Sequence, residues 1–219
     1  MDNPFAPLTA AEIDKAVAIF RREQKGDNAV FCSSGLDEPA KADVKAGKSV
    51  PRIVKFLGTD SAPDGGFEVY VNLDDDKIER LIRLGNDAQA PYGYYDLGVA
   101  VQLTKSNPEW LSAVKARGVA CETEKDLERI QIDPWPAGGY ADAEVPAGHR
   151  ALRCIAFVRE DETDNGYARP IHGVICHVDV TAGQVVRVED TGVVPMPPNP
   201  GRFDAAHQDS ARTDLKDLE

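Results

Sequence analysis

The sequence IHGVICHVDVTAGQVVRVED, residues 171–190, holds two apolar-rich runs on either side of the turn-forming stretch TAGQ. Runs rich in Val and Ile that are separated by a short Gly-containing connection predict two antiparallel strands joined as a hairpin. Two more strands are predicted upstream, and the first strand of the hairpin is expected to begin before residue 171. The four predicted strands are 127–135, 150–160, 168–180 and 184–194.

A helix is predicted before these strands. In SNPEWLSAVKARG, residues 106–118, Asn107 suits the N-cap, Pro108 the first helical position and Gly118 the position after the end. The preceding stretch YDLGVAVQLTK, residues 95–105, predicts a further short helix. This half of the chain is therefore expected to contain a helix or helix pair followed by four strands.

The first half of the chain repeats this order. Residues 8–26 predict a helix, because Thr9 and Glu12 form a capping box, apolar residues recur at helical spacing and Gly26 suits the end. Four strand-like segments follow, and the last, KIERLIRL, is predicted as a twisted edge strand in preference to a short helix. These segments are 29–34, 51–59, 66–73 and 77–84.

A helix laid across a curved antiparallel sheet buries the apolar faces of both elements. The sequence therefore predicts an α+β fold of two tandem domains, each a helix or helix pair packed on an antiparallel four-stranded sheet. We expect the domains at residues 1–90 and 91–198. Residues 199–219 are rich in Pro and polar side chains and predict a linker or an extended arm.

The chain is acidic, with a net charge of −12 over 219 residues. An acidic surface repels nucleic-acid phosphates and anionic lipids, so neither a nucleic acid nor a membrane is an expected partner. No run approaches the roughly 18 apolar residues of a membrane span, and the first residues lack the apolar core of a signal peptide. Four widely separated cysteines without a CxxC pair predict free, mostly buried thiols and a cytoplasmic location.

His172, Cys176 and His177 lie within six residues and raise the question of a metal site. On a strand, Cys176 and His177 point to opposite faces, and His172 and Cys176 are about 13 Å apart at roughly 3.3 Å per residue. Zinc requires donors at about 2 Å from the ion. We therefore expect no metal ligands here, unless a loop replaces the strand.

Other candidate sites have simpler interpretations. FCSSG has hydroxyls but no nearby His, NLDDDK lacks the spacing of a calcium loop, and PAGGY does not connect a strand to a helix. Trp110 occupies a core position of a predicted helix. Trp135 lies between Pro134 and Pro136, which keep its backbone out of a central strand, so its ring is expected to cap a core or line a cleft. No catalytic residue is predicted.

Several of these segments resemble the copper amine oxidases, in the same order and at the expected separations. They are PLTAAEIDKAV, NPEWLSAVKARG, IQIDPWPAGG, LRCIAFVRE, DNGYARPIHGVICHVDV and GQVVRVEDTGVVPMPP. The resemblance covers nearly the whole chain and is densest over residues 129–198.

This resemblance implies a definite architecture and activity for the full enzyme. Family members are homodimers that oxidise primary amines to aldehydes, with release of ammonia and hydrogen peroxide, by means of copper and topaquinone. Two small cystatin-like domains precede the large domain that holds both groups. The present sequence resembles those two domains alone, and SARTDLKDLE, at its end, resembles the junction to the large domain.

The chemistry of the full enzyme requires motifs that this sequence lacks. The quinone forms from a Tyr in a Thr-x-x-Asn-Tyr-Asp/Glu motif, and none of the seven asparagines here is followed by Tyr. There is also no His-x-His pair for copper. We therefore expect no cofactor in this chain, no catalytic residue and no metal ligand. Amine oxidation by the chain alone is excluded.

The resemblance also implies a role in substrate access. In family members the second small domain contributes to the wall of the amine channel, and the matching positions here are Pro134, Trp135, Tyr167 and, less securely aligned, Leu97. An apolar, aromatic wall desolvates the hydrocarbon part of an amine, and a ring attracts its ammonium group. The simpler alternative is that Trp135 and Tyr167 only cover the sheet.

Two functions remain open from the sequence. The first is the non-catalytic N-terminal region of a copper primary amine oxidase, which pairs with the catalytic domain in the same polypeptide or as a separate subunit. The second is a stand-alone binding module that has the fold without the activity, an alternative suggested by the Met at the start of the chain.

Overall fold

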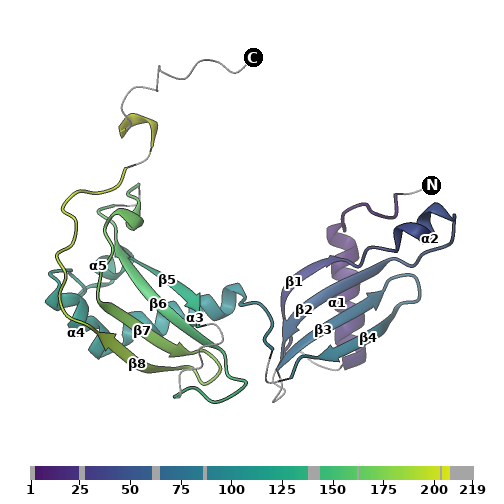
Figure 1. Ribbon diagram of the computed structural model, residues 1–219, viewed down its shortest axis with the longest axis horizontal. Coiled ribbons are helices and arrows are strands. Elements are labelled where there is room, and N and C mark those ends of the chain that lie inside the picture. Colours follow the sequence, from purple (N-terminus) through teal and green to yellow (C-terminus); the bar gives the residue numbers. More distant parts are fainter. Residues whose placement is uncertain are drawn as a thin grey trace. The chain divides into compact units, whose positions relative to one another are not determined.

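The computed structural model describes residues 3–24, 28–60, 65–85, 88–137, 144–161, 163–202 and 204–207. These residues belong to two compact units (Figure 1). The first unit comprises residues 1–96 together with 146–150, and the second comprises 97–145 together with 151–219. No helix within the described parts of the chain is long and apolar enough to cross a membrane.

The first unit is a four-stranded antiparallel sheet with one long helix on a single face (Figure 1). The strands lie in the order β1-β2-β3-β4. The elements are α1 (Ala10–Gln24), β1 (Val30–Leu36), α2 (Lys41–Lys45), β2 (Ile53–Thr59), β3 (Gly66–Asn72) and β4 (Lys77–Arg83). The predicted edge strand of KIERLIRL is confirmed as β4.

The core of the first unit lies between α1 and the sheet. Ile19 and Phe20 of α1 are buried with the inward side chains of β2 and β3. The rings of Phe20 and Phe67 stack with their centroids 5.2 Å apart. Phe31 of β1 meets both rings edge-on. Stacked and edge-to-face rings stabilise a core beyond the area that they bury.

The start of α1 is fixed by the predicted capping box. The Glu12 amide donates to Thr9 Oγ1 at 3.3 Å, and the Thr9 amide donates to Glu12 Oε2 at 2.7 Å. Glu12 also accepts a hydrogen bond from Arg52 Nε at 2.7 Å, which connects the helix to the residue before β2. Gly26, the predicted helix end, lies outside the described residues.

The second unit has the same layered construction, with helices on one face of an antiparallel sheet in the order β5-β6-β7-β8 (Figure 1). Its helices are α3 (Tyr94–Ser106), α4 (Pro108–Ala116) and α5 (Glu124–Glu128), with two 3-10 turns, η1 (Gly166–Ala168) and η2 (Ala205–His207). Its strands are β5 (Ile130–Pro136), β6 (Ala151–Val158), β7 (Val174–Asp179) and β8 (Gln184–Asp190). The predicted α+β class with two such sheets is confirmed.

The helix pair of the second unit follows the sequence prediction. Asn107 caps α4 by accepting from the Trp110 amide at 2.9 Å, Pro108 begins the helix and Gly118 has a φ of +75°. Trp110 is completely buried, as expected of a core residue. Cys154 Sγ lies 3.9 Å from the Ala100 carbonyl of α3, which places the even-numbered residues of β6 under this helix.

The edge position of β5 explains the prolines on either side of Trp135. Ala137 N donates to Ala151 O, and Arg159 N donates to Arg129 O. In this register the backbone N–H and C=O groups of the odd-numbered residues of β5 form the hydrogen bonds to β6. Pro134 and Pro136 therefore turn their nitrogens to the free edge of the sheet. A missing N–H is harmless there, and it prevents further strands from adding to that edge.

Three details of the strand prediction are wrong. The predicted strand 184–194 ends at Asp190, shortly before Gly192, which has a φ of +103°. The predicted strand 168–180 begins only at Val174, because Gly173 has a φ of +75° and a Cβ there would lie 2.5 Å from Gly192 O. Such a backbone ends a strand. The start of predicted strand 127–135 is occupied by α5, whose capping box joins Thr123 and Asp126.

One side chain connects the helical layer to both strands of the last hairpin. Arg117, at the end of α4, is 2% exposed and pairs with Asp190 Oδ1 at 2.7 Å. It also donates to the carbonyls of His172, Gly173 and Gly192. The pairing lowers the pKa of Asp190. A single guanidinium thus satisfies carbonyls before β7 and after β8.

The Glu12–Arg52 pair makes the stability of the first unit dependent on pH. The hydrogen bond from Arg52, followed by those from Thr9, lowers the pKa of Glu12 from 4.5 to about 2. The pair's contribution is therefore complete above pH 4.5 and is lost as the pH falls toward 2. We expect Glu12→Gln to lower the free energy of unfolding by about 1–2 kcal/mol at pH 7, with a smaller loss at pH 3.

Urea unfolding at several pH values measures this effect. Asp14→Asn, an exposed change on the same helix, is the matched control and should keep the wild-type pH dependence. An identical pH dependence in Glu12→Gln and wild type would contradict the assignment.

Candidate functional site

The sheet of the second unit has a helix-covered face and an open face. Alternation along β7 places Cys176 on the helix side, where it is fully buried. His177 lies on the other side, with its Nε2 3.2 Å from Glu189 Oε2 and 3.3 Å from an Arg187 nitrogen. The prediction that Cys176 and His177 point to opposite faces is therefore confirmed.

His172 does not lie on a strand, contrary to the prediction. It is an exposed residue of the turn before β7, where Gly173 prevents the strand from extending to it. In the described ranges there is no group of three His, Cys, Asp or Glu side chains placed to hold a metal ion.

The four cysteines are free thiols, and three of them are buried. The burial of three of the four confirms the prediction of mostly buried thiols. Burial raises the pKa of the Cys154 thiol to about 12. Since the thiolate is the reactive form, Cys154 is suited to packing and not to nucleophilic chemistry.

The open face presents two exposed aromatic side chains. Trp135 of β5 is 58% exposed, and Tyr167 of η1 is 60% exposed. Asp133 lies on the same strand face as Trp135, two residues earlier, and its Oδ2 accepts from the Tyr167 hydroxyl at 2.7 Å. Gln131, two residues earlier again, donates to the other carboxylate oxygen at 3.0 Å. Gln131 and Asp133, alternate residues of the edge strand β5, thus hold Tyr167 on the face of the sheet that also carries Trp135.

Local backbone structure sets the position of Tyr167. Asn165 caps η1 by accepting from the Tyr167 amide at 3.0 Å. Gly166 packs so closely that a Cβ there would lie 2.8 Å from Gln131 Oε1 and 3.3 Å from Phe157 Cβ. The rings of Tyr167 and Phe157 then meet edge-to-face, with centroids 4.9 Å apart. The 3-10 turn therefore lies directly on the open face.

The other two predicted wall residues lie elsewhere. Alternation directs Pro134 to the helix side of β5, and it is half-buried. Leu97 is half-buried in the first turn of α3, and none of the contacts described for the chain joins it to Trp135 or Tyr167. Of the four, the structure brings Trp135 and Tyr167 together on one face.

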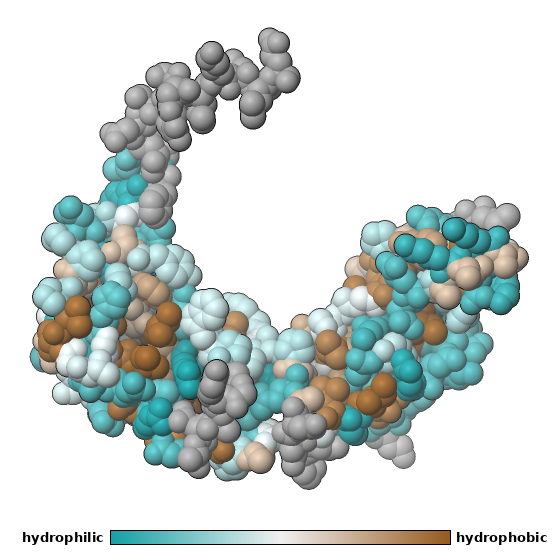
Figure 2. Space-filling view, in the orientation of Figure 1, coloured by the Kyte–Doolittle hydropathy of each residue, from teal (hydrophilic) through white to brown (hydrophobic). Residues whose placement is uncertain are grey.

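The open face is chemically mixed. Figure 2 shows apolar residues interspersed with polar ones over the second unit, without one continuous apolar area. Arg187 and Glu144 form an ion pair there, with 3.5 Å between nitrogen and oxygen. This face can contact an apolar or aromatic group through Trp135 and Tyr167 and an ionic group through Asp133. It offers no nucleophile or general base placed for catalysis within the described residues.

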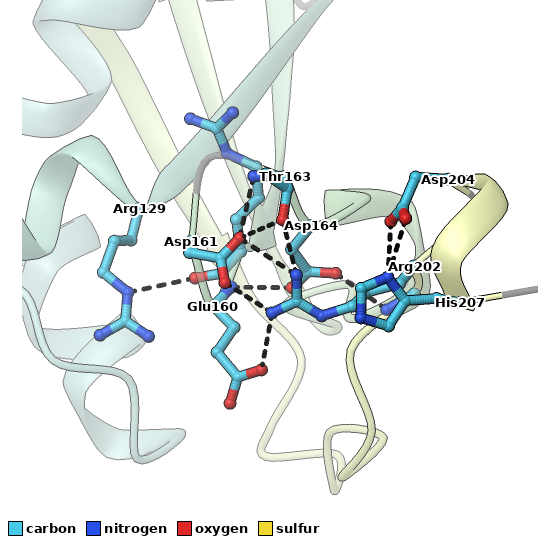
Figure 3. A network of polar contacts seen from close by, with 10 residues as sticks. Arg129, Glu160, Asp161, Thr163, Asp164, Arg202, Asp204 and His207 are labelled. Carbon is cyan, nitrogen blue, oxygen red and sulfur yellow. Dashed lines mark hydrogen bonds and ion pairs between the residues drawn. The ribbon is translucent and has the colours of Figure 1, made fainter.

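The segment after β8 is joined to the loop after β6 by a polar network (Figure 3). Arg202 donates to Asp161 Oδ2 at 2.5 Å and to Thr163 Oγ1 at 2.6 Å. The Gly201 amide donates to Asp164 Oδ1 at 2.9 Å, and its carbonyl accepts from Asn165. Arg202 lowers the pKa of Asp161 well below its usual range. The segment predicted to be a linker or an extended arm is held against this loop at residues 201–202.

Two other sequence candidates have structural roles. The NLDDDK stretch is a turn in which Asn72 Oδ1 accepts from the amides of Asp74 and Asp75 at 3.0 and 3.1 Å. The glycines of PAGGY lie outside the described residues. Asp133 had no signal in the sequence, because only the folded chain brings residue 167 over residue 133.

Comparison with known proteins identifies the family to which this chain is similar. Residues 96–206, just over half of the chain, match the family model of the copper amine oxidase N3 domain. The primary amine oxidase of Arthrobacter sp. (strain P1) is 32% identical over 219 residues, which is all of this chain and 33% of that protein. The histamine oxidase of Arthrobacter globiformis is 28% identical over 224 residues, or 99% of this chain and 31% of that protein.

Solved structures agree on the fold. The copper-containing benzylamine oxidase of Hansenula polymorpha superposes with a TM-score of 0.72 at 15% sequence identity, covering 99% of this chain and 36% of that one. The present chain therefore spans about a third of the length of the relatives that it matches.

The fold and the open face define a two-unit α+β protein without a catalytic constellation among its described residues. The chain belongs to the copper amine oxidase family and corresponds to the N-terminal part of its members.

The hydrogen bond between Tyr167 and Asp133 can be measured by titration. Asp133 raises the pKa of the Tyr167 hydroxyl, because the phenolate would lose this bond and lie beside a negative carboxylate. We expect Asp133→Asn to lower the pH at which Tyr167 ionises.

Ultraviolet absorbance of the phenolate reports this ionisation, and subtraction of the Tyr167→Phe titration isolates Tyr167. Glu124→Gln, an exposed acidic change in the same unit, is the control and should leave the midpoint unchanged. An unaltered midpoint in Asp133→Asn would contradict the bond.

Proposed function

We propose that this chain is the non-catalytic N-terminal region of a copper- and topaquinone-dependent primary amine oxidase. In the full enzyme, which oxidises primary amines to aldehydes with release of ammonia and hydrogen peroxide, its two cystatin-like units pack with the catalytic domain. That domain belongs to the same polypeptide or to a separate subunit, and the full enzyme is a homodimer. The four free thiols support a cytoplasmic location.

We further propose that the second unit forms part of the wall of the amine channel. The observation that carries this proposal is the pair of exposed aromatic side chains on one sheet face, with the Tyr167 hydroxyl held by Asp133. A large ring that is fixed yet more than half exposed leaves apolar area available to another surface. Such area suits the hydrocarbon part of an amine, and a ring attracts an ammonium ion.

Pro134 and Leu97 contribute less directly to this wall. Both are half-buried, so we assign to them the shaping of the β5 end and of the first turn of α3. Trp135 and Tyr167 are the side chains expected to meet the substrate.

The residues of this chain do not fit the copper ion or the quinone. The four histidines, at 149, 172, 177 and 207, include no His-x-His pair, and no group of metal-binding side chains gathers within the described residues. The quinone-forming Asn-Tyr pair is absent from the sequence. Copper and topaquinone therefore belong to the catalytic domain, and this chain's part is binding and orientation.

Substitution of the exposed rings tests the wall. In the assembled enzyme, Trp135→Ala and Tyr167→Ala should change the ratio of kcat/KM between a bulky and a short primary amine by roughly 5-fold or more. Quinone absorbance should remain normal, because the quinone forms elsewhere. Ile82→Ala, an exposed apolar change on β4, is the control. If discrimination between amines is unchanged, the two rings only cover the sheet.

Copper content tests the proposal that the metal site lies in the catalytic domain and not in this chain. After extensive dialysis, elemental analysis of the isolated chain should give far less than one copper per chain, whereas the assembled enzyme should give about one per catalytic domain. One tightly held copper ion per isolated chain would contradict the proposal.

The alternative of a stand-alone binding module is separated by the genomic sequence downstream and by purification. A downstream reading frame with the quinone and copper motifs, or a copurifying large subunit, supports the oxidase assignment. The absence of both would favour the binding module.

A further inference from the structure

Asp133 of β5 is a carboxylate that has only neutral partners on the open face. Its Oδ2 accepts from the Tyr167 hydroxyl at 2.7 Å, and its Oδ1 accepts from the Gln131 side-chain amide at 3.0 Å. Within the part of the chain that the structure describes, no Lys, Arg or His forms an ion pair with Asp133. A carboxylate has about four positions for hydrogen-bond donors, and neutral donors leave its charge in place. Asp133 can therefore accept a cationic donor in addition to these two groups.

The charge of Asp133 is only partly screened by water. Its side chain is half-buried, and a charge that is partly removed from water interacts more strongly with a neighbouring ion than an exposed charge does. In the register of β5 and β6, the residue opposite Asp133 is Ile155, which is apolar and also half-buried. The directly facing strand therefore supplies no group that compensates the carboxylate.

The cations of this face do not neutralise Asp133. Arg187 pairs with Glu144, with 3.5 Å between nitrogen and oxygen. Arg153 lies opposite Trp135, two residues along β6 from the position that faces Asp133, and it forms no ion pair within the described ranges. Its positive charge disfavours a further cation at that end of the face. The Asp133 end is therefore the one that favours an ammonium group.

The two exposed rings lie on the same face as Asp133. The Tyr167 hydroxyl is bonded to the carboxylate, and Trp135 follows two residues later on the same side of β5. Two residues span roughly 7 Å along a strand, which is comparable to the length of a short alkyl chain. Aromatic rings contact hydrocarbon well and attract ammonium groups. One small molecule can therefore meet a ring with its hydrocarbon part and Asp133 with a cationic end.

We propose that Asp133 is a specificity-determining residue that binds a second cationic group of the amine substrate and so favours diamines over monoamines. The inference rests on the proposed function, because it requires the open face to line the amine channel. In the proposed enzyme the reacting amino group goes to the catalytic domain, so a carboxylate in the wall meets the other end of the substrate. An apolar end gains nothing from this charge, whereas an ammonium group forms a charge-assisted hydrogen bond with it.

Substitution of Asp133 in the assembled enzyme tests the assignment with 1,4-diaminobutane and butylamine, which share one carbon chain. Asp133→Asn retains an oxygen that can accept from the Tyr167 hydroxyl, and it removes the charge. We expect the ratio of kcat/KM for the diamine to that for the monoamine to fall about 5- to 10-fold. An unchanged ratio would overturn the assignment, even if both values fell together.

Two further variants separate charge from shape. Asp133→Glu keeps the charge and should preserve a larger part of the diamine preference than Asp133→Asn does. If both substitutions lower the ratio equally, the charge is not decisive and the assignment is wrong. Glu124→Gln removes an exposed charge from α5 and should leave the ratio within 2-fold of wild type. An equal fall in this control would show an effect of overall charge and overturn the assignment. Circular dichroism verifies that each variant is folded.

The failure of this inference is distinguishable from the failure of the proposed function. If Asp133→Asn leaves the ratio unchanged while Trp135→Ala and Tyr167→Ala alter discrimination between bulky and short amines, the channel wall stands and the role of Asp133 is refuted. If none of the three variants changes discrimination between amines, the channel wall is refuted and the role of Asp133 with it.

Discussion

The structure depends on a single constraint, which is that helices cover each sheet on one face only. Every strand must then present apolar side chains to the helices at alternate positions, and the side chains between them lie on the face that no helix covers. In β7 this rule buries Cys176 among the helices and leaves His177 with Glu189 and Arg187. In β5 the same rule buries Ile130 and Ile132 and places the odd-numbered residues, among them Trp135, on the face without helices.

The exposed aromatic side chains on the open face of the second sheet come from a loop as well as from a strand. The turn η1 rests on this face because Gly166 allows close contact with Phe157 and Gln131. Asp133 then fixes the Tyr167 hydroxyl while most of the ring stays exposed. Rigid placement of an exposed ring costs little side-chain entropy when another surface or a ligand meets it. This exposed and fixed ring is the basis of the proposal that the second unit forms part of a channel wall.

At the other end of the same unit, an ion pair fixes the segment after β8. Arg202 pairs with Asp161 at 2.5 Å and donates to Thr163 Oγ1 at 2.6 Å. A pair between residues that are distant in sequence thus completes the fold outside the sheet.

Local signals in the sequence were sufficient where local interactions decide the structure. The capping residues Thr9 and Asn107 and the alternation in β7 and β8 predicted helices, strands and faces correctly, since these follow from neighbouring residues alone. The strand prediction upstream of Val174 failed because Gly173 approaches Gly192, which is distant in sequence.

The sequence by itself thus determined the α+β class, the two repeated layers, the burial of Trp110 and, through its ordered motifs, the family. Only the tertiary structure decided that Asp133 meets Tyr167, that Gly173 approaches Gly192, and that Arg202 pairs with Asp161. The physical reason is that a hydrogen bond or an ion pair between distant residues depends on distances across the fold, which no spacing along the chain records.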